Sequence, residues 1–261
     1  MSKMIVVKIG GVALGGSDTT MEDLVCLQKQ GRSLVVVHGG GQQLTEWLAR
    51  QGISTRFVHG KRVTDEATLE VAAAVLAGLT NKEIVAALNN RGGRVIGLSG
   101  VDGALLQSRI EDVALGYVGE VVKVDTAILG TLLAAGYIPV ISSMGLHSVD
   151  KPAGAPLILN INADSAAGEI AVAMGAASLI FLTDVAGVAD QSGKLLSRLS
   201  IQEAEALLAS GVVSEGMIPK VQASLRTLAT TTTARIVDGR EPHALLREVG
   251  GYGDGTTIYK D

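Results

Sequence analysis

Aromatic residues and cysteine are scarce in this chain of 261 residues. Aromatic residues make up only 3% of it although 47% of the chain is hydrophobic, so the core must be built from aliphatic side chains and alanine. Such a core is typical of helices packed on parallel strands. The single cysteine, Cys26, can form neither an intrachain disulfide nor a cysteine metal cluster, which favours a reducing compartment.

Other absences exclude whole classes of protein. The N-terminus lacks the three regions of a signal peptide, and no apolar run reaches about 18 residues, which predicts a soluble cytoplasmic protein with no membrane partner. A net charge of -4 without a basic cluster argues against a nucleic-acid partner. The chain contains no P-loop motif, and the glycines of the segment 97–103 (GLSGVDG) have the wrong spacing for a dinucleotide fingerprint.

Short apolar runs alternate with helical patterns along the chain. This alternation predicts a mainly parallel sheet that is covered by helices on both faces. The predicted strands are Met4–Ile9, Leu34–Val37, Val95–Leu98, Ile138–Ser142, Leu179–Leu182 and Arg235–Val237. The predicted helices are Gln42–Arg50, a long segment from the cap Thr64-Asp65-Glu66 to Asn90, Thr126–Ala135, Ser165–Met174 and Ile201–Ser210.

Two segments depart from the alternation. Alternating apolar residues in Leu115–Val124 predict a small hairpin around Gly119, laid over the sheet edge. The segment Asp150–Pro156 holds two of the five prolines and is predicted to be a loop. The most natural lobe boundary is the loop near Gly175–Ala177.

Two strands run directly into glycines, and the first of them carries a lysine. Lys8 precedes Gly10 and Gly11, and His38 precedes three glycines that include Gly40 and Gly41. Open α/β sheets bind ligands at the carboxyl ends of their strands, and helix N-termini attract anions. Either junction alone would be an ordinary tight turn, but together they predict an anionic ligand.

Polar residues elsewhere fit the same ligand. Asn160, Asn162 and Asp164 would point one way along an extended backbone, which suits a ligand with an amide and a carboxylate, although Asp164 could be only a helix N-cap. Lys220 falls in the first turn of a helix, where a cation opposes the helix dipole unless an anion lies beside it.

A basic pair and a strand end complete the candidate residues. In the pair Lys61-Arg62, which precedes the longest helix, Arg62 is the better carboxylate ligand because of its planar guanidinium. Asp184 ends a predicted strand and is well placed to hold the sugar or base of a nucleotide.

Six motifs of the chain resemble those of the amino acid kinase superfamily, and within it those of the N-acetyl-L-glutamate kinases of arginine biosynthesis. The resemblance covers essentially the whole chain, in the right order. It implies an α/β fold, a three-layer αβα sandwich with a mainly parallel central sheet. It also implies an N-terminal lobe (residues 1–175) for acetylglutamate and dimerisation, and a C-terminal lobe (residues 176–261) for ATP. The motifs are KIGG (8–11), HGGG (38–41), GKRVTD (60–65), NINAD (160–164), LTDVAGV (182–188) and GMIPKV (216–221).

The resemblance further implies an ATP-dependent phosphorylation of the γ-carboxylate of N-acetyl-L-glutamate, with ATP and Mg²⁺ as cofactors and no metal ligand assigned to the chain. The γ-carboxylate is already ionised at neutral pH, so the reaction needs no general base, in accord with the absence of a catalytic histidine motif. The resemblance implies that Lys8 and Lys220 stabilise the transferring phosphoryl group and that Asp164 orients these two lysines. It implies that the amides of Gly40 and Gly41 contact the γ-carboxylate and that Gly10 and Gly11 lie beside the phosphate. It also implies that Arg62 binds the α-carboxylate and that Asn160 holds the α-substituents.

Assembly and function leave alternatives open. The first predicted strand begins at residue 4, without the N-terminal helix of arginine-inhibited hexameric members, whereas His243–Thr256 resembles a stretch associated with arginine sensing. We expect a homodimer without strong arginine control. The rival functions are a kinase of carrier-protein-bound aminoadipate or glutamate, which needs a basic rim, and a catalytically dead sensor on the same fold.

Overall fold

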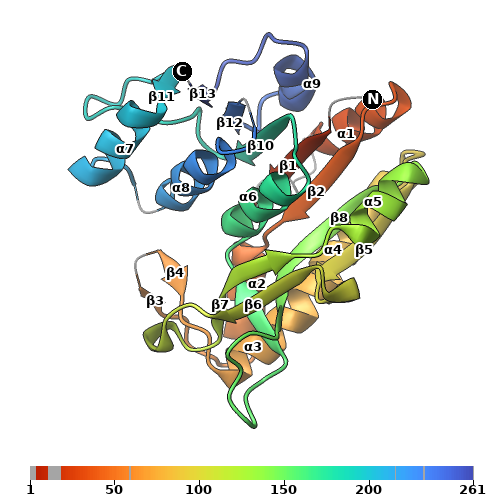
Figure 1. Cartoon of the computed structure of the whole chain (residues 1–261), viewed down its shortest axis with the longest axis vertical. Helices are drawn as coiled ribbons and strands as arrows, with labels where there is room; N and C mark the ends of the chain where they lie inside the picture. Colours follow the sequence, from red (N-terminus) through yellow and green to blue (C-terminus); the bar gives the residue numbers. More distant parts are fainter. Residues whose placement is uncertain (1–3, 11–18, 59, 215, 232, 261) are drawn as a thin grey trace.

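A single eleven-stranded sheet runs through the protein (Figure 1). The computed structural model describes residues 4–10, 19–58, 60–214, 216–231 and 233–260. The strand order is β11-β13-β12-β10-β1-β2-β8-β6-β7-β9, and β5 pairs with β8 outside this path. The strands are β1 (Ile5–Ile9), β2 (Leu34–His38), β5 (Val95–Gly100), β6 (Leu106–Ile110), β7 (Val118–Val124), β8 (Ile138–His147), β9 (Ile158–Ile161), β10 (Ser178–Thr183), β11 (Arg198–Ser200), β12 (Thr233–Asp238) and β13 (Thr256–Tyr259).

The centre of this sheet is parallel. Strand β1 lies between β2 and β10 and is parallel to both, and β8 and β12 extend the parallel region on either side. The antiparallel pairs are β6–β7, β8–β9 and β12–β13. A separate two-stranded hairpin, β3 (Phe57–Val58) with β4 (Lys61–Arg62), stands apart from the main sheet. Because the central strands are parallel, their carboxyl ends meet at one edge, where β1 and β2 end in glycines.

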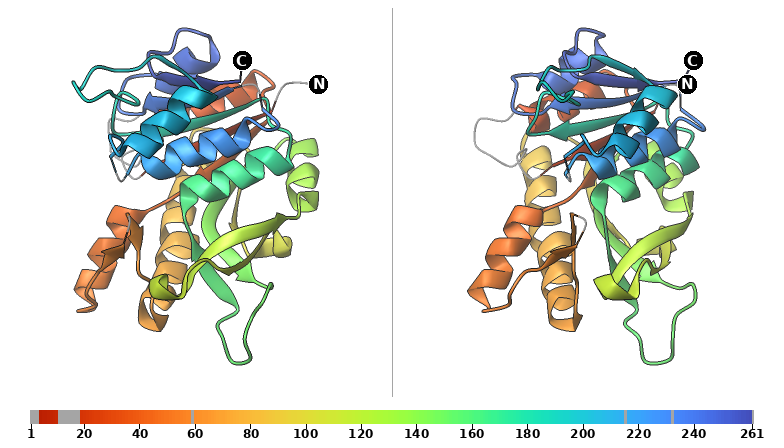
Figure 2. Two further views of the ribbon diagram at one scale, coloured as in Figure 1. Left: turned by 60° about the vertical axis from the view of Figure 1, so that its left-hand side comes forward. Right: turned by 90° about the vertical axis from the view of Figure 1, so that its left-hand side faces the viewer.

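Helices cover both faces of the sheet, as Figure 2 shows. Successive side chains of a strand point to opposite faces, so Val6 and Val35 belong to one buried cluster whereas Val7 and Val36 belong to the other. Helices α5, α6, α7 and α8 contribute to the first cluster, and α1, α4 and α9 to the second. The helix bounds are α1 (Thr20–Lys29), α2 (Gly41–Arg50), α3 (Glu66–Ala72), α4 (Asn81–Asn90), α5 (Ala127–Ala134), α6 (Ala163–Ala173), α7 (Ile201–Ser210), α8 (Ile218–Thr227) and α9 (Ala244–Val249).

The predicted long helix is present as one continuous helix from Glu66 to Asn90. Asp65 caps its N-terminus by accepting a hydrogen bond from the amide of Thr68 at 2.8 Å. Between α3 and α4 the helix widens into a π-helical segment, η1 (Ala73–Thr80), which the apolar pattern did not reveal. By length and composition alone this helix could cross a membrane, and 44% of its most apolar window is buried inside the protein. Buried leucines of this helix pack in the protein's own core clusters.

The sequence-based expectations for the sheet are confirmed, with one correction. All six predicted strands are present, and the segment Asp150–Pro156 is the loop that joins β8 to β9. The hairpin predicted around Gly119 is wrong, because Gly119 lies inside β7 and pairs with Ile110 of β6. A Cβ at Gly119 would lie 2.7 Å from Ile161 Cδ1, so this glycine permits close packing of β9 rather than a turn.

Candidate active site

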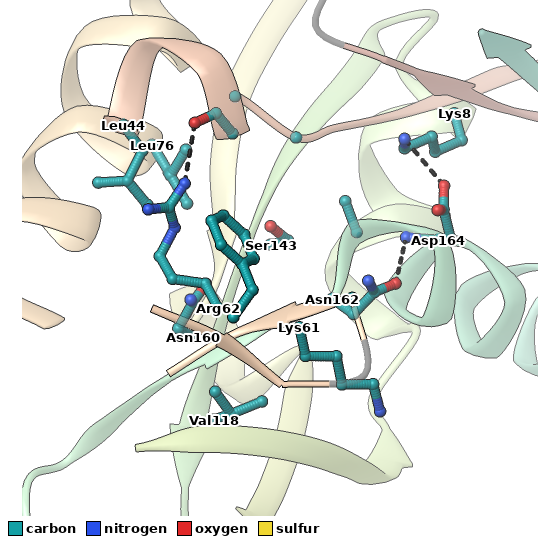
Figure 3. Close-up of a pocket in the computed structure, with 16 residues that line it drawn as sticks. Lys8, Leu44, Lys61, Arg62, Leu76, Val118, Ser143, Asn160, Asn162 and Asp164 are labelled. Carbon is teal, nitrogen blue, oxygen red and sulfur yellow. Dashed lines mark hydrogen bonds and ion pairs between the residues drawn. The ribbon is translucent and has the colours of Figure 1, made fainter. Parts of the chain in front are cut away.

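A polar cavity of 230 Å³ opens at the carboxyl ends of β1 and β2 (Figure 3). Eight residues singled out from the sequence line it: Lys8, Gly40, Gly41, Lys61, Arg62, Asn160, Asn162 and Asp164. They come from five parts of the chain: β1, the start of α2, β4, β9 and α6. The fold therefore brings together groups that are more than 150 positions apart in the sequence.

Asp164 lies between two lysines. Its Oδ1 is 2.8 Å from Lys8 Nζ, and its Oδ2 is 3.2 Å from Lys220 Nζ. All three side chains are largely buried. Burial alone would raise the pKa of the Asp164 carboxyl, but the charges of Lys8 and Lys220 outweigh it and hold that pKa below its usual range. The three groups therefore carry one net positive charge beside the cavity.

The N-cap of α6 is Asn162 and not Asp164. Asn162 Oδ1 accepts hydrogen bonds from the amides of Asp164 and Ser165, each at 3.0 Å. Helix α6 therefore begins at Ala163, two residues earlier than the pattern predicted, and Asp164 stands in its first turn. The cap interpretation of Asp164 is wrong, because the capping position is already occupied and its carboxylate is directed to the two lysines.

The first turn of α8 holds Lys220, as predicted. Pro219 precedes it at the start of the helix, where a missing N–H costs nothing. Lys220 Nζ donates to Gly216 O at 3.0 Å in addition to its contact with Asp164. The anion that a lysine at this position requires is thus supplied by another helix of the same chain.

The turn from β2 into α2 forms a second wall of the cavity. Gly40 has φ +152°, and a Cβ there would lie 2.7 Å from Leu76 Cδ2, so only glycine fits. Gly41 is the first residue of α2, where amide groups lack partners within the helix. These amides suit an anion such as a carboxylate.

Arg62 is held against the first turn of α2. Its guanidinium donates to Gly41 O at 3.0 Å and to Thr45 Oγ1 at 2.7 Å, and it lies 4.8 Å from the centre of the Phe57 ring. Burial lowers the pKa of Arg62 below its usual range, although a guanidinium stays charged. Within the described residues no carboxylate forms an ion pair with Arg62, so its charge is available to a ligand.

Asn160 faces the cavity from β9. Its Nδ2 donates to Thr64 Oγ1 at 3.1 Å, and Thr64 Oγ1 in turn donates to Arg62 O. This chain of hydrogen bonds joins the two residues that were expected to hold the α-substituents of a ligand. Thr64 was missed as a site residue, and only its place in the motif GKRVTD could have drawn attention to it.

Two candidate nucleotide residues, Gly10 and Asp184, are not among the described residues that line this cavity. Gly10 lies next to it, and its amide donates to Leu182 O at 3.0 Å, whereas Gly11 lies outside the described residues. Asp184 is exposed and accepts a hydrogen bond from Thr183 Oγ1 at 3.2 Å. A second cavity, of 360 Å³, is lined by residues 185–190, which directly follow Asp184, and by residues 212–214, which form the approach to α8. The residues of that approach, Val212–Ser214, were missed because nothing in their sequence resembles a site.

The model of the amino acid kinase family matches residues 3–238. The chain belongs to the amino acid kinase family. The chain is 46% identical over 255 residues to an acetylglutamate kinase of Dehalococcoides mccartyi strain CBDB1, an alignment that covers 98% of this chain and 94% of the relative. The predicted superfamily, the predicted similarity to acetylglutamate kinases and the predicted fold class are confirmed.

Two solved structures resemble this family member over its length. The protein smu.665 from Streptococcus mutans UA159 superposes with a TM-score of 0.84 at 27% identity, and each chain is covered completely. N-acetylglutamate synthase from Neisseria gonorrhoeae, solved with coenzyme A and N-acetylglutamate, gives a TM-score of 0.84 at 28% identity, covering 99% of this chain and 60% of that one.

Proposed function

We propose that this amino acid kinase catalyses the ATP-dependent phosphorylation of the γ-carboxylate of N-acetyl-L-glutamate, a step of arginine biosynthesis. The product is N-acetyl-L-glutamyl 5-phosphate. The observation that carries this proposal is the buried carboxylate of Asp164 between Lys8 and Lys220 at the edge of a cavity rich in amide donors. Its 46% identity to an acetylglutamate kinase supports the choice of substrate.

The chemistry requires two anions to be brought together. The γ-carboxylate attacks the γ-phosphorus of ATP, the bond to the bridging oxygen breaks, and ADP leaves with the electron pair. The transferring group carries its charge on peripheral oxygens, so catalysis is mainly positioning and electrostatic stabilisation. Lys8 and Lys220 would supply fixed positive charge there, and Asp164 would keep the two ammonium groups in place.

The acyl substrate would lie across the cavity. The amides of Gly40 and Gly41 would hold the γ-carboxylate, and Arg62 would bind the α-carboxylate with its free charge. Asn160 Nδ2 is already engaged by Thr64, so Asn160 Oδ1 would accept the N–H of the acetamido group. Because the α-carboxylate would be held at Arg62, the length of N-acetylglutamate would place its γ-carboxylate, and not its α-carboxylate, at the two lysines.

The nucleotide is assigned to the C-terminal lobe, residues 176–261, and the acyl substrate to residues 1–175. The second cavity, next to Asp184, supports this division because it lies close to Lys220 along the chain. The phosphates would extend past Gly10 and Gly11. Among the described residues, Asp164 is the only carboxylate that lines the first cavity, and both of its oxygens already face ammonium groups. These residues do not provide a protein site for Mg²⁺, which we propose accompanies ATP on its phosphates.

The surroundings of the cavity disfavour the carrier-bound alternative. Lys61 is paired with Glu111, and Arg62 is buried, so this basic pair does not form an exposed rim. Both lysines are in place, which disfavours a dead sensor. We further propose that the protein is a cytoplasmic homodimer. Its single cysteine supports the cytoplasmic location, because the cytoplasm is a reducing compartment.

Trapping of the acyl phosphate with hydroxylamine tests the proposal. Purified protein with ATP and Mg²⁺ should form a hydroxamate with N-acetyl-L-glutamate and little with glutamate, aspartate or a carrier-bound substrate. Lys8→Ala should abolish the signal, whereas Lys123→Ala, on an exposed part of β7, should not. Hydroxamate formation from the carrier-bound substrate alone would replace our proposal with the alternative.

A further inference from the structure

His38 ends β2 directly before the glycine turn, and its side chain is buried. Its Nδ1 lies 2.7 Å from Gly39 O, and its Nε2 lies 3.1 Å from Asn81 Nδ2. Asn81 is the first residue of α4 and is completely buried. A buried imidazole with a partner on each nitrogen is fixed in orientation, yet the phosphoryl transfer described above does not use it.

The partners of His38 determine which nitrogen carries the proton. A carbonyl oxygen only accepts, so the contact with Gly39 O requires a proton on Nδ1. Asn81 Nδ2 also lies 3.0 Å from Val140 O and 3.2 Å from Leu98 O, which fixes that atom as the amide donor. Nε2 of His38 therefore accepts from Asn81.

The ring is also neutral. Burial, together with the positive charges of Lys8 and Lys82, lowers the pKa of His38 to about 4. A neutral imidazole has one donor and one acceptor, and both are used here. The Nδ1–H tautomer is thus maintained at neutral pH, where the γ-carboxylate is ionised.

The contact with Gly39 O bears on the candidate carboxylate site. A peptide unit is planar, and in the trans form its N–H points opposite to its C=O. Holding Gly39 O on the side of His38 therefore directs the amide of Gly40 the other way. Gly39, Gly40 and Gly41 all line the cavity. Because glycines restrict their own backbone little, the orientation of this peptide has to be set by a neighbour.

We propose that His38 is a positioning residue, whose Nδ1–H holds the Gly39–Gly40 peptide so that the Gly40 amide meets the carboxylate that is phosphorylated. Asn81 keeps His38 in the required tautomer. This inference rests on the proposed function, because it assigns a role to the same cavity. His38 is not among the described residues that line the cavity, so its effect would be exerted through the peptide.

Two substitutions of His38 separate the two ring nitrogens. In His38→Asn the side-chain amide stands at the distance of Nδ1 from the backbone and can still donate to Gly39 O. In His38→Gln the amide stands at the distance of Nε2, so the donor to Gly39 O is lost. His147 provides the matched control, because it is also buried and its Nδ1 lies 2.9 Å from Pro156 O, away from the cavity. His147→Gln therefore removes the same kind of contact elsewhere.

The readout is the pair of Michaelis constants together with the melting temperature. We expect His38→Gln to raise KM for N-acetylglutamate about threefold to tenfold, the effect of one hydrogen bond, and to leave KM for ATP unchanged. His38→Asn should stay within about twofold of the parent, and His147→Gln should lower only the melting temperature. Equal KM values in the Gln variant and the parent would overturn the inference, as would equal rises in both His38 variants.

A measurement on the unmodified protein gives a test that does not depend on whether the His38 variants fold. With only four histidines in the chain, ¹⁵N-labelled imidazoles can be followed in proton–nitrogen correlation spectra, and the missing signal of His38→Asn assigns His38. We expect the Nδ1–H tautomer at pH 6–8, and an Nε2–H tautomer would refute the proposal. An inactive parent protein would instead contradict the proposed function and leave the tautomer result interpretable by itself.

Discussion

At the scale of single residues, one buried carboxylate shared by two ammonium groups leaves a net positive charge at the cavity. That charge matters most when the phosphoryl group carries its extra negative charge in the transition state. Losing one such donor typically costs about 2.7–4 kcal/mol of transition-state stabilisation. We therefore expect Lys8→Ala and Lys220→Ala each to lower kcat about 100-fold to 1,000-fold.

These two variants should remain folded, because Asp164 keeps one partner in each. Thermal melting and hydroxamate formation on the same preparations check this, with Lys123→Ala as the control for the loss of a lysine. Turnover near that of the parent in either variant would remove that lysine from the mechanism.

Asp164→Asn isolates the negative charge, since Asn162 keeps the helix cap. Two buried ammonium groups without a counter-charge repel each other, so we expect kcat to fall by about 100-fold or more. Stability should also fall at pH 7, because a carboxyl with a lowered pKa stabilises the folded state above its unfolded pKa. That difference from the parent should begin to narrow only below about pH 4, where the unfolded parent takes up a proton at Asp164, and should close as the pH falls through the lower pKa of the folded state.

Denaturant unfolding of parent and Asp164→Asn between pH 7 and pH 3 measures this difference directly. An equal free energy of unfolding at pH 7, together with unchanged turnover, would show that the charge of Asp164 has no role.

Arg62→Lys tests the proposed binding of the substrate's α-carboxylate by Arg62. A lysine keeps the positive charge but loses the planar guanidinium, whose Nη2 donates to Gly41 O and Thr45 Oγ1 and whose Nη1 donates to Thr55 Oγ1. We expect KM for N-acetylglutamate to rise about tenfold with KM for ATP little changed. A change confined to the ATP constant would move Arg62 to the nucleotide site.

Some of the residues that line this cavity were found from the sequence because charged groups stood beside glycines and at strand ends, whereas Leu44, Leu76 and Ser143 carried no such signal. Thr64 and Asn81 were not found, since each acts through another side chain across a large sequence separation. Asp164 was recognised, but its alternative role as a cap could be rejected only when Asn162 was seen to make both capping hydrogen bonds.

At the scale of secondary structure, the N-terminus of α6 carries both the cap residue Asn162 and the candidate catalytic residue Asp164. Asn162→Ala removes the acceptor for two amides and should cost about 1 kcal/mol of stability. Because the same turn carries Asp164, we also expect a lower kcat. Asn162→Ser keeps a capping oxygen and should recover most of both losses. Calorimetry and turnover check the pair, and an alanine variant as stable as the parent would mean that this cap contributes nothing.

Which elements could be predicted follows from their composition. The central strands β1, β2 and β10 are rich in valine, leucine and isoleucine, so they were evident from the sequence. The last two strands at one end of the sheet, β13 and the edge strand β11, are short and contain polar residues, so their pairing depends on the strands beside them. Gly119 misled the prediction because a glycine in a strand that allows close packing looks, in sequence, like a glycine in a turn.

At the scale of the whole molecule, one continuous sheet supports two sites. Strands β1 and β2 lead to the first cavity, whereas β10, beside β1, leads to the second. Lys8 of β1 pairs with Phe181 of β10, the adjacent parallel strand, so hydrogen bonding within the sheet connects the two regions directly. A nucleotide in one region and an acyl substrate in the other would therefore meet at the lysines without a large rearrangement of the sheet.

The assignment of the two lobes predicts opposite effects for two substitutions. Ala186 lines the second cavity and is exposed to it, so a large side chain there would occupy the space of a nucleotide. Ala186→Trp should raise KM for ATP about tenfold or more and leave KM for N-acetylglutamate within about twofold, the reverse of Arg62→Lys. Ala186→Ser, which adds little volume, is the matched control. Because the two sites lie at different strand ends, a rise in both constants in the tryptophan variant would contradict the division at residues 175 and 176 and place both substrates in one cavity.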